Sequence, residues 1–570
     1  PIAGIELISE FKGKVQTCGF LITKTGEVAD SKQVKNLTHD NIPRDGAEAK
    51  VGIDFGSNNS CISYSILRGV SSEPVKFKSR RVMFIGNEVV DPNSEKLADL
   101  HELLFFQNEE PNNGQIKSWI QQHDQRYVPN HMKSAEIAGG TPVFEPNLDV
   151  LEVESEIIRT RRGQISHNLK WRNDDYGMNF KKGYIKTLWM AICAELYAID
   201  SANVPKKIEL MWAHPSALNR ADVYSYNAMY RELKQLNAIS GATIDVKEPM
   251  TESEAVCNYA IYKGGVAIHP DNMMLGIDVG GSTSDILMVA NYQGKLQLVQ
   301  QSSIRLAANK LSVVAQKSEA VRKALRHFVD SSKSIRIKHI NNMETTPSTA
   351  PYFLNLIFDR LPENDFETFY GQIYQSPAVQ ANARQMFAVP AYISGILLFY
   401  SGQLIAHTLQ QLGISSVNTF DLFPFGKGGR IFDWLSSFLT NSRVTAYYEA
   451  CLKAGMGDAY RQVKINFNHD RKNIKSEVSF GLSSTKDVEK LADTFNDLIG
   501  EAGFTYQNET LQVNSELKIE HFKNLPALTP PAKFEQFEKF LNIYFETGRE
   551  TGYLTDRKST RLNSSHITIS

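Results

Sequence analysis

Residues 51–62 read VGIDFGSNNSCI and residues 275–286 read LGIDVGGSTSDI, so the two stretches align without a gap. Each has an apolar run that ends in an aspartate, a short turn of Gly, Ser, Asn or Thr, and a second apolar run. Small and polar residues between two apolar runs predict a β-hairpin with a tight turn. The repetition therefore predicts two similar halves of one molecule.

The turn of each hairpin has the chemistry of a phosphate site. Backbone N–H groups and hydroxyls exposed at such a turn attract anions, and the aspartate beside it is placed to hold the counter-cation. One copy would be weak evidence, because a plain hairpin with a turn aspartate has the same pattern. Two copies predict that both halves face one nucleotide.

Composition is that of an ordinary globular protein: of 570 residues, 42% are hydrophobic and 22% are charged. This length predicts about three to four domains. The formal net charge of −1 gives no reason to expect binding to nucleic acid or to an anionic membrane surface.

The cysteines are scattered and none belongs to a C-x-x-C pair; they are Cys18, Cys61, Cys193, Cys257 and Cys451. This pattern argues against a disulfide framework and a structural zinc site, and it predicts a reducing, cytoplasmic location. Residues 385–409 contain no Asp, Glu, Lys or Arg but include Pro390 and several polar residues. We interpret them as a buried core helix and expect no membrane span.

From the two ends of the sequence we expect it to be incomplete or altered. Residue one is Pro, and the apolar runs near 5–8 and 18–23 have no evident partners, so we expect the chain to begin inside a longer reading frame. Residues 556–570 are rich in Ser, Thr and Asn and resemble translated adapter or vector sequence. We expect this tail to be non-native.

The elements follow a repeated order along the chain. Apolar patterns predict a hairpin over 6–11 and 16–23, strands over 208–212 and 296–301, largely helical structure over 305–385, and helices over 184–198, 221–236, 488–500 and 534–547. Alternating strands and helices predict an α/β fold. The expected divisions are a partial β segment and linker (1–49), a first lobe with an inserted subdomain (50–270), a second lobe with an inserted subdomain (271–485), a C-terminal helical extension (486–555) and the tail (556–570).

These motifs resemble the superfamily of actin, sugar kinases and seventy-kilodalton heat-shock chaperones. Within it, the chain is most similar to the chaperone ATPase domain and its bacterial relatives. The resemblance covers residues 50–485 and rests on five short motifs. It implies an actin-like ATPase fold, in which two ribonuclease-H-like lobes with inserted subdomains surround a nucleotide cleft.

The first motif, DFGSNNSC at 54–61, is close to the chaperone pattern D-x-G-T-T-N-S-x. The resemblance implies that Asp54 holds magnesium through water, a ligand arrangement that this ion prefers. Gly56, Ser57 and Asn58 would then line the β- and γ-phosphates.

The second motif, DVGGSTSD at 278–285, resembles D-x-G-G-G-T-x-D. The resemblance implies that Asp278 is a second carboxylate at the cation and the reacting phosphate, whereas Asp285 would either hold the turn or touch the ligand. Glycine lets the backbone approach an anion closely. The implied phosphate-binding residues are Gly280, Gly281, Ser282 and Thr283.

The segment PMTESEAVC occupies the place of the family's connecting helix, whose glutamate orients the water that attacks the γ-phosphate. Glu252 aligns best, with Glu248 and Glu254 as rivals, and Thr251 with Glu254 would equally form a helix capping box. For the catalytic lysine of the chaperones the candidate is Lys170, which would otherwise be an ordinary surface lysine.

The adenosine motif of the family, G-G-S-S-R-I, is matched by FGKGGRI at 425–431. By resemblance, Gly426, Gly428 and Gly429 would pack on the ribose and base, and Arg430 would stack on adenine. The segment KSEVSFGL at 475–482 resembles the second connecting helix, with Gly481 where two helices cross.

The resemblance implies an ATPase that depends on ATP and Mg²⁺ and works as a conformational switch read by a protein partner or client. The alternatives are an actin-like or cell-division-like filament protein and a small-molecule kinase. The sequence contains no G-x-x-x-x-G-K-[ST] loop, nucleophile elbow or H-E-x-x-H motif, which removes support from other ATPase and hydrolase classes.

Overall fold

The computed structural model describes residues 4–11, 14–22, 48–57, 59–66, 72–77, 81–85, 112–113, 115–117, 120–123, 143–145, 163–166, 169–171, 178, 181–182, 184–185, 188–189, 192–193, 196, 205–236, 242–269, 272–332, 345–347, 350, 353–354, 357, 385–414, 417–432, 441–458, 462–468, 476–495, 505–507, 509–510, 528–529 and 534–551. The chain divides into two compact units. The first unit contains Pro1–Ala267 and Lys472–Val488, and the second contains Ile268–Arg471 and Glu489–Ser570.

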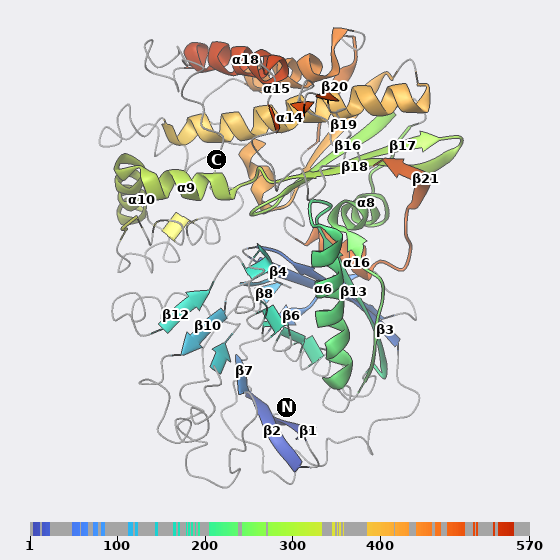
Figure 1. Ribbon diagram of the computed structural model, residues 1–570, viewed down its shortest axis with the longest axis vertical. Helices are drawn as coiled ribbons and strands as arrows, with labels where there is room; N and C mark the ends of the chain where they lie inside the picture. The colour runs from blue at the N-terminus through green and yellow to red at the C-terminus, as the bar shows by residue number, and fades with distance from the viewer. Residues whose placement is uncertain are drawn as a thin grey trace. The chain divides into compact units, whose positions relative to one another are not determined.

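The central sheet of the first unit has the strand order β14-β13-β3-β4-β5 (Figure 1). Strands β3 and β4 form an antiparallel hairpin, β13 runs parallel to β3, and β14 runs parallel to β13. The bounds are β3 Glu48–Phe55, β4 Asn59–Ile66, β5 Glu73–Pro74, β13 Lys207–His214 and β14 Thr243–Val246. Two short strands extend it, with β9 (Gln115–Lys117) on β4 and β15 (Met250–Thr251) on β13.

The sheet of the second unit has the order β20-β19-β16-β17-β18-β21. Its hairpin β16–β17 is antiparallel, β19 runs parallel to β16, and β20 runs parallel to β19. The bounds are β16 Asn272–Val279, β17 Ser284–Tyr292, β18 Lys295–Ile304, β19 Thr419–Phe425, β20 Lys464–Phe467 and β21 Glu489–Phe495. Both units therefore place a hairpin next to a pair of parallel strands in the same order.

The repeat in the sequence is a repeat in three dimensions. In the first hairpin Asp54 lies opposite Cys61, and in the second Asp278 lies opposite Asp285. The two hairpins thus share one register from end to end. This confirms the prediction of two hairpins and of a mixed α/β fold.

Gly52 on β3 has no side chain, so a helix from a distant part of the chain can pack closely against the strand. A Cβ atom on Gly52 would lie 2.5 Å from the carbonyl oxygen of Ser479 and 2.6 Å from Cβ of Leu482, both on α16 (Glu477–Ser483). α16 also crosses α8 (Glu252–Tyr262), where a Cβ on Gly481 would lie 1.7 Å from the carbonyl oxygen of Ala255. The predicted helix crossing at Gly481 is therefore confirmed.

Hydrogen bonds of serine hydroxyl groups join α16 to β4 and to the residue before β5. Ser63 and Ser479 share a hydrogen bond of 2.7 Å, and Ser65 donates to the carbonyl oxygen of Ser483 at 2.7 Å. Ser72 bonds the Ser483 hydroxyl at 2.6 Å. Each of these buried groups has a partner, as buried polar groups require.

The predicted helices of the first unit are confirmed where they are described. The helical residues between 184 and 196 are buried: Tyr184, Ile185, Leu188, Trp189, Ile192, Cys193 and Leu196. α6 (Arg220–Arg231) continues into the 3-10 helix η4 (Glu232–Leu236). Trp212 of β13 stacks on Tyr230 of α6 with ring centroids 4.8 Å apart, which joins this helix to the sheet.

The first strands of the chain do have partners. β1 (Gly4–Phe11) pairs with β2 (Lys14–Ile22), as the predicted hairpin requires, and β2 pairs with β7 (Arg81–Ile85). They belong to a sheet of order β1-β2-β7-β11-β10-β12, completed by β10 Ile120–His123, β11 Val143–Glu145 and β12 Gly163–Ser166. β6 (Lys76–Phe77) pairs with β8 (Asn112–Asn113). The expectation that the first strands lack partners was wrong, because their partner outside the hairpin, β7, lies far along the chain at Arg81–Ile85.

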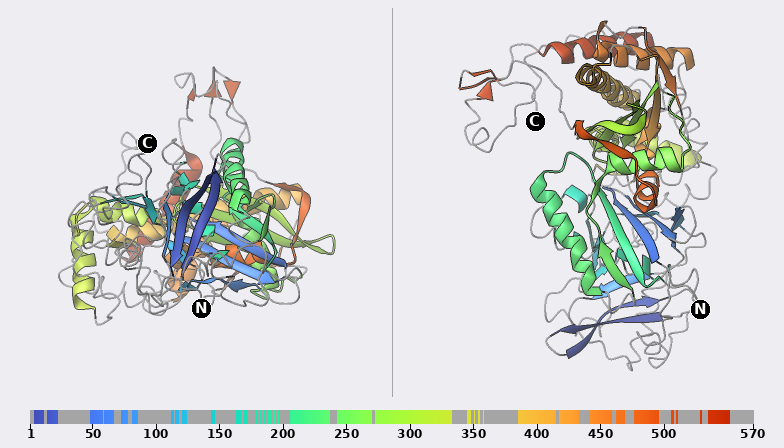
Figure 2. Two further views of the ribbon diagram at one scale, coloured as in Figure 1. Left: turned by 90° about the horizontal axis from the view of Figure 1, so that it is seen from below. Right: turned by 90° about the vertical axis from the view of Figure 1, so that its right-hand side faces the viewer.

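Among the residues that the structure describes, the second unit includes the helices α9 Asn309–Lys317, α10 Glu319–Ser331, α14 Gln385–Leu412, α15 Asn441–Met456 and α18 Glu535–Thr551. Figure 2 shows α18 beside α14 and α15. Glycines bring α14 and α15 together, because a Cβ on Gly402 would lie 2.2 Å from the carbonyl oxygen of Leu452. Three short strands, β22 Thr505–Tyr506, β23 Glu509–Thr510 and β24 Leu528–Thr529, form a small separate sheet.

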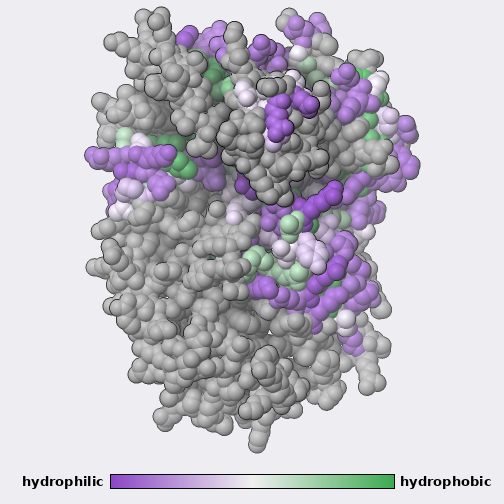
Figure 3. Space-filling view, viewed as in Figure 1, coloured by the Kyte–Doolittle hydropathy of each residue, from purple (hydrophilic) through white to green (hydrophobic). Residues whose placement is uncertain are grey.

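One helix among the described residues, α14, is long and apolar enough over Ala388–Leu412 to cross a membrane, and 67% of its most apolar window is buried. On the face drawn in Figure 3 the described side chains are mostly hydrophilic, with small separate apolar groups. The absence of a membrane span stays a prediction.

One predicted helix is a strand. Residues 488–500 were expected to be helical, but Glu489–Phe495 forms β21 and pairs in parallel with β18. The exposed edge of β18 supplies backbone partners, and tertiary pairing of this kind overrides a helical pattern. The helix predicted over 534–547 is confirmed by α18.

Candidate functional site

The bend of the first unit begins with a buried carboxylate. Asp54 is near the end of β3 and 6% exposed, and Ser57, two residues beyond the strand, is also 6% exposed. Gly56 lies between the strand and Ser57, whereas Asn58 lies outside the described residues. An acid and a hydroxyl are thus held on one bend.

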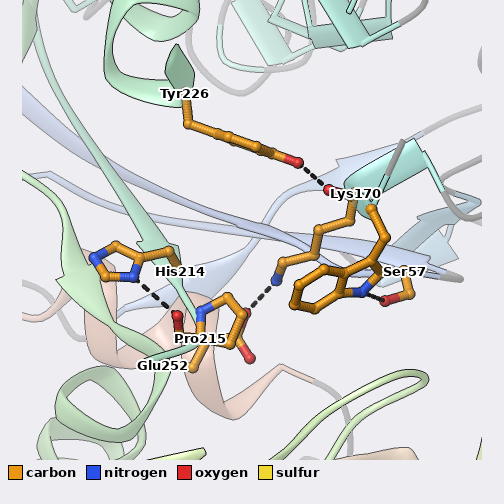
Figure 4. Close-up of polar contacts among 7 residues, drawn as sticks. Ser57, Lys170, His214, Pro215, Tyr226 and Glu252 are labelled. Carbon is orange, nitrogen blue, oxygen red and sulfur yellow. Dashed lines mark hydrogen bonds and ion pairs between the residues drawn. The ribbon is translucent and has the colours of Figure 1, made fainter. Parts of the chain in front are cut away.

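Lys170 and Glu252 form a buried ion pair (Figure 4). Lys170 lies on the 3-10 helix η3 (Leu169–Trp171), and Glu252 is the first residue of α8. Their side chains are only 4% and 9% exposed. The alternative interpretation of Lys170 as a surface lysine was therefore wrong, and the two catalytic candidates of the sequence lie in contact.

The rival glutamates have other partners. Glu248 is exposed and accepts a hydrogen bond of 2.7 Å from Arg231. Glu254 caps α8: its backbone N–H donates to Thr251 Oγ1 and its carboxylate accepts from the Thr251 N–H. The capping box predicted for these two residues is confirmed, and Glu252 is the glutamate that reaches Lys170.

Hydrogen bonds from two aromatic side chains, one of them on η3 itself, hold η3 in place. Trp171 Nε1 donates to Ser57 Oγ across 3.1 Å, and the Tyr226 hydroxyl donates to the carbonyl oxygen of Lys170. η3 therefore connects the bend to the ion pair. Neither Trp171 nor Tyr226 was predicted from the sequence, because three residues of 3-10 helix carry no periodic signal and Tyr226 resembles any buried position of an amphipathic helix.

His214 lies at the end of β13, in register with Thr251 just before Glu252. Its Nδ1 is 3.1 Å from the carbonyl oxygen of Pro215. Burial lowers the pKa of His214, and the charge of Lys170 acts in the same direction, whereas the contact with Pro215 and the carboxylates of Glu252 and Glu254 oppose it. Among the described residues no group of three His, Cys, Asp or Glu side chains is arranged to hold a metal ion.

A second buried lysine lies nearby. Lys181 is fully buried, and its Nζ lies 4.7 Å from the ring centroid of Tyr226. Phe55 of β3 packs against the same tyrosine, with ring centroids 6.2 Å apart. A cation over an aromatic face is stabilised by the ring quadrupole, so Tyr226 joins the buried Lys181 to the core around Phe55.

The bend of the second unit is closed by backbone hydrogen bonds. The Gly280 N–H donates to the carbonyl oxygen of Thr283 at 2.9 Å. The carbonyl oxygens of Gly280 and Gly281 accept from Ala308 and Asn309 at the start of α9, at 3.3 and 2.9 Å. Thr283 is buried, and Ser282 completes the turn. The bend is thus held by a hydrogen bond within itself and by two hydrogen bonds from the start of α9.

The glycine-rich motif lies against this bend. Gly426 has φ of +71°, and a Cβ there would lie 2.1 Å from Asp278 Oδ1. A Cβ on Gly428 would lie 2.5 Å from the carbonyl oxygen of Val279. Gly429 donates to the carbonyl oxygen of Gly426 at 3.0 Å, at the start of the 3-10 helix η8 (Lys427–Phe432). Arg430 is half-buried on η8, so the second and third motifs meet within one unit.

Gly426→Ala is expected to lower the unfolding free energy by about 1–3 kcal/mol, because a side chain at positive φ is strained and would also displace Asp278. Urea unfolding without nucleotide measures this effect. Gly429→Ala is the matched control, since its Cβ would meet no atom closer than 3.4 Å. Equal losses in both variants would contradict the packing described here.

Two carboxylates of the second unit share one face of the sheet. Asp278 and Asp285 are directly opposite each other on β16 and β17, and both are buried. Residues paired in this way point to the same side of a sheet. A scan against protein-family models found no match to this chain, and a search of curated proteins found no significantly similar sequence.

Proposed function

We propose that the protein is an ATP-binding and ATP-hydrolysing conformational switch that resembles a heat-shock chaperone ATPase domain. The observation that carries the proposal is the duplicated sheet, in which two hairpins of equal register each hold a buried aspartate before a polar bend. In this proposal each unit is a ribonuclease-H-like lobe, and both bends bind the phosphates of one nucleotide.

The bends suit an oxygen-rich anion. The first supplies the Ser57 hydroxyl, and the second supplies Thr283 and the backbone of Gly281 and Ser282. Successive N–H groups at such a turn attract phosphate. The adenosine end of the nucleotide would lie at the glycine-rich motif, because Gly426 and Gly428 pack directly against the phosphate bend of the same unit.

The carboxylates suit magnesium. Mg²⁺ in nucleotide sites takes one or two carboxylates and fills its remaining positions with water and phosphate oxygens. Asp54 and Asp278, each at the end of the first strand of a hairpin, are the residues that would hold it. A bound Mg²⁺ would neutralise charge on the phosphates during transfer.

Hydrolysis would depend on the ion pair of the first unit. The Lys170 ammonium group can stabilise negative charge that develops on the γ-phosphate, and the Glu252 carboxylate can orient the attacking water. Both groups are shielded from bulk water, which strengthens their electrostatic effect.

The test is ATP binding and turnover with magnesium. Asp278→Ala is expected to weaken Mg²⁺-dependent ATP binding about 10- to 100-fold, and Thr283→Ala about three- to tenfold through the loss of one hydrogen bond. Asp330→Ala, which removes an exposed carboxylate paired with Arg326 on α10, is the control and should bind normally. Unchanged nucleotide affinity in both site variants would remove the assignment.

The same preparation separates the alternative functions. Phosphate release without any acceptor supports an ATPase, whereas turnover that requires an added small molecule indicates a kinase. Sedimentation that depends on ATP would indicate a filament. A protein partner or client and a cytoplasmic location follow from the resemblance and remain part of the proposal.

A further inference from the structure

Trp171 connects the first bend to the buried ion pair. Its indole Nε1 donates to Ser57 Oγ at 3.1 Å, a contact between residues 114 positions apart. It also follows Lys170 directly on η3. A change at Trp171 therefore reaches the phosphate bend through this hydrogen bond.

The direction of that bond is fixed by chemistry. An indole N–H can only donate, so the Ser57 oxygen must accept. A serine hydroxyl has one hydrogen to donate, and this hydrogen is left to point toward another acceptor. The oxygens of a phosphate ester are acceptors, so the bond prepares Ser57 as a donor to an anion.

The support of Trp171 is rigid. Leu169 is fully buried, the Lys170 carbonyl accepts from Tyr226, and the Lys170 side chain is paired with Glu252. The three residues of η3 are thus held by a core contact, a backbone contact and an ion pair. Groups that orient a binding residue do so best when their own positions are fixed in this way.

We infer that Trp171 is a positioning residue for ATP, and that it orients the Ser57 hydroxyl hydrogen toward a phosphate oxygen of the nucleotide. This role rests on the proposed function and adds a residue to it. Trp171 acts through Ser57, so its loss affects how tightly the phosphates are held rather than the chemical step.

The experiment is a double-mutant cycle read by titration with a fluorescent ATP analogue and magnesium. Trp171→Phe keeps an aromatic ring and removes the N–H, and it should raise the dissociation constant about three- to tenfold, the effect of one neutral hydrogen bond. The turnover number should stay unchanged while KM rises. Ser57→Ala should weaken binding at least as much, and adding Trp171→Phe to it should have no further effect.

Trp189→Phe is the matched control. Trp189 is a buried tryptophan of the same unit, and its indole N–H has no hydrogen-bond partner among the described residues. The same chemical change there should leave ATP affinity unaltered. Equal effects of the two tryptophan changes, or effects of Trp171→Phe and Ser57→Ala that multiply, would overturn the inference.

A second measurement applies if Trp171→Phe does not fold. In protein labelled with ¹⁵N-tryptophan, Ser57→Ala should shift one indole N–H resonance, and ATP with magnesium should shift the same resonance in the wild type. Absence of either shift overturns the role of Trp171. Wild-type protein that binds no ATP would remove the proposed function together with this inference, whereas binding with multiplying effects would remove the inference alone.

Discussion

Lys170→Met is expected to lower ATP turnover about 100- to 1,000-fold, the usual cost of removing a group that stabilises transition-state charge. It is also expected to lower the unfolding free energy by about 3–5 kcal/mol. The second effect arises because Glu252 would remain as a buried carboxylate without its cation. Phosphate release and urea unfolding measure the two quantities separately.

A second change separates stability from catalysis. Adding Glu252→Gln to Lys170→Met removes the uncompensated charge, so most of the lost stability should return while turnover stays low. A catalytic role for the pair is contradicted if turnover recovers with stability.

Lys182→Met is the matched control for the loss of a lysine. Lys182 pairs with Glu232 at 2.7 Å, but the two side chains are 38% and 28% exposed. Exposed ion pairs contribute about 0–1 kcal/mol, so this variant should retain wild-type stability and turnover. A large loss at Lys182 would show that the assays respond to lysine substitution in general.

Gly481→Ala is expected to lower the unfolding free energy by about 3 kcal/mol or more, because overpacking against backbone cannot be relieved by side-chain rotation. The added Cβ would lie 1.7 Å from the carbonyl oxygen of Ala255 and 2.5 Å from its carbonyl carbon. α8 and α16 would have to separate, which would also disturb Glu252 at the start of α8.

Gly264→Ala provides the comparison for Gly481→Ala. The new Cβ would come no closer than 3.0 Å to another atom, the carbonyl oxygen of Ala260. Its cost should stay within about 1 kcal/mol. Unfolding in urea, followed by tryptophan fluorescence, measures both variants. Similar midpoints would mean that the helix crossing tolerates a side chain and would contradict the close contact.

The parts of the fold that depend on local pattern were predictable from the sequence. Both hairpins and the strand over Lys207–His214 follow from apolar runs and turn residues. These features depend on residues that are close together in the chain, so a single sequence is enough to predict them.

Contacts between distant residues were not predictable in the same way. Lys170 and Glu252 were each singled out by resemblance, but nothing in the sequence indicates that they touch, because they are 82 positions apart. The hydrogen bond from Trp171 to Ser57 and the packing of Lys181 on Tyr226 also depend on how the sheet and helices meet. The pairing of β21 with β18 replaced a helical pattern for the same reason.

The first unit is assembled from two separate parts of the chain, and this affects its synthesis. When Ala267 leaves the ribosome, α16 has not yet been made. The backbone at Gly52 then lacks the helix that packs on it, and the hydroxyls of Ser63 and Ser65 lack their hydrogen-bond partners. Translation must continue through the sheet strands β16 to β20 before that helix emerges. The unit made first is therefore finished late. A fragment that stops at Ala267 would leave Ser63 and Ser65 without their partners on α16, and Tyr259 without the Phe480 ring that it stacks on, within reach of chaperones and proteases.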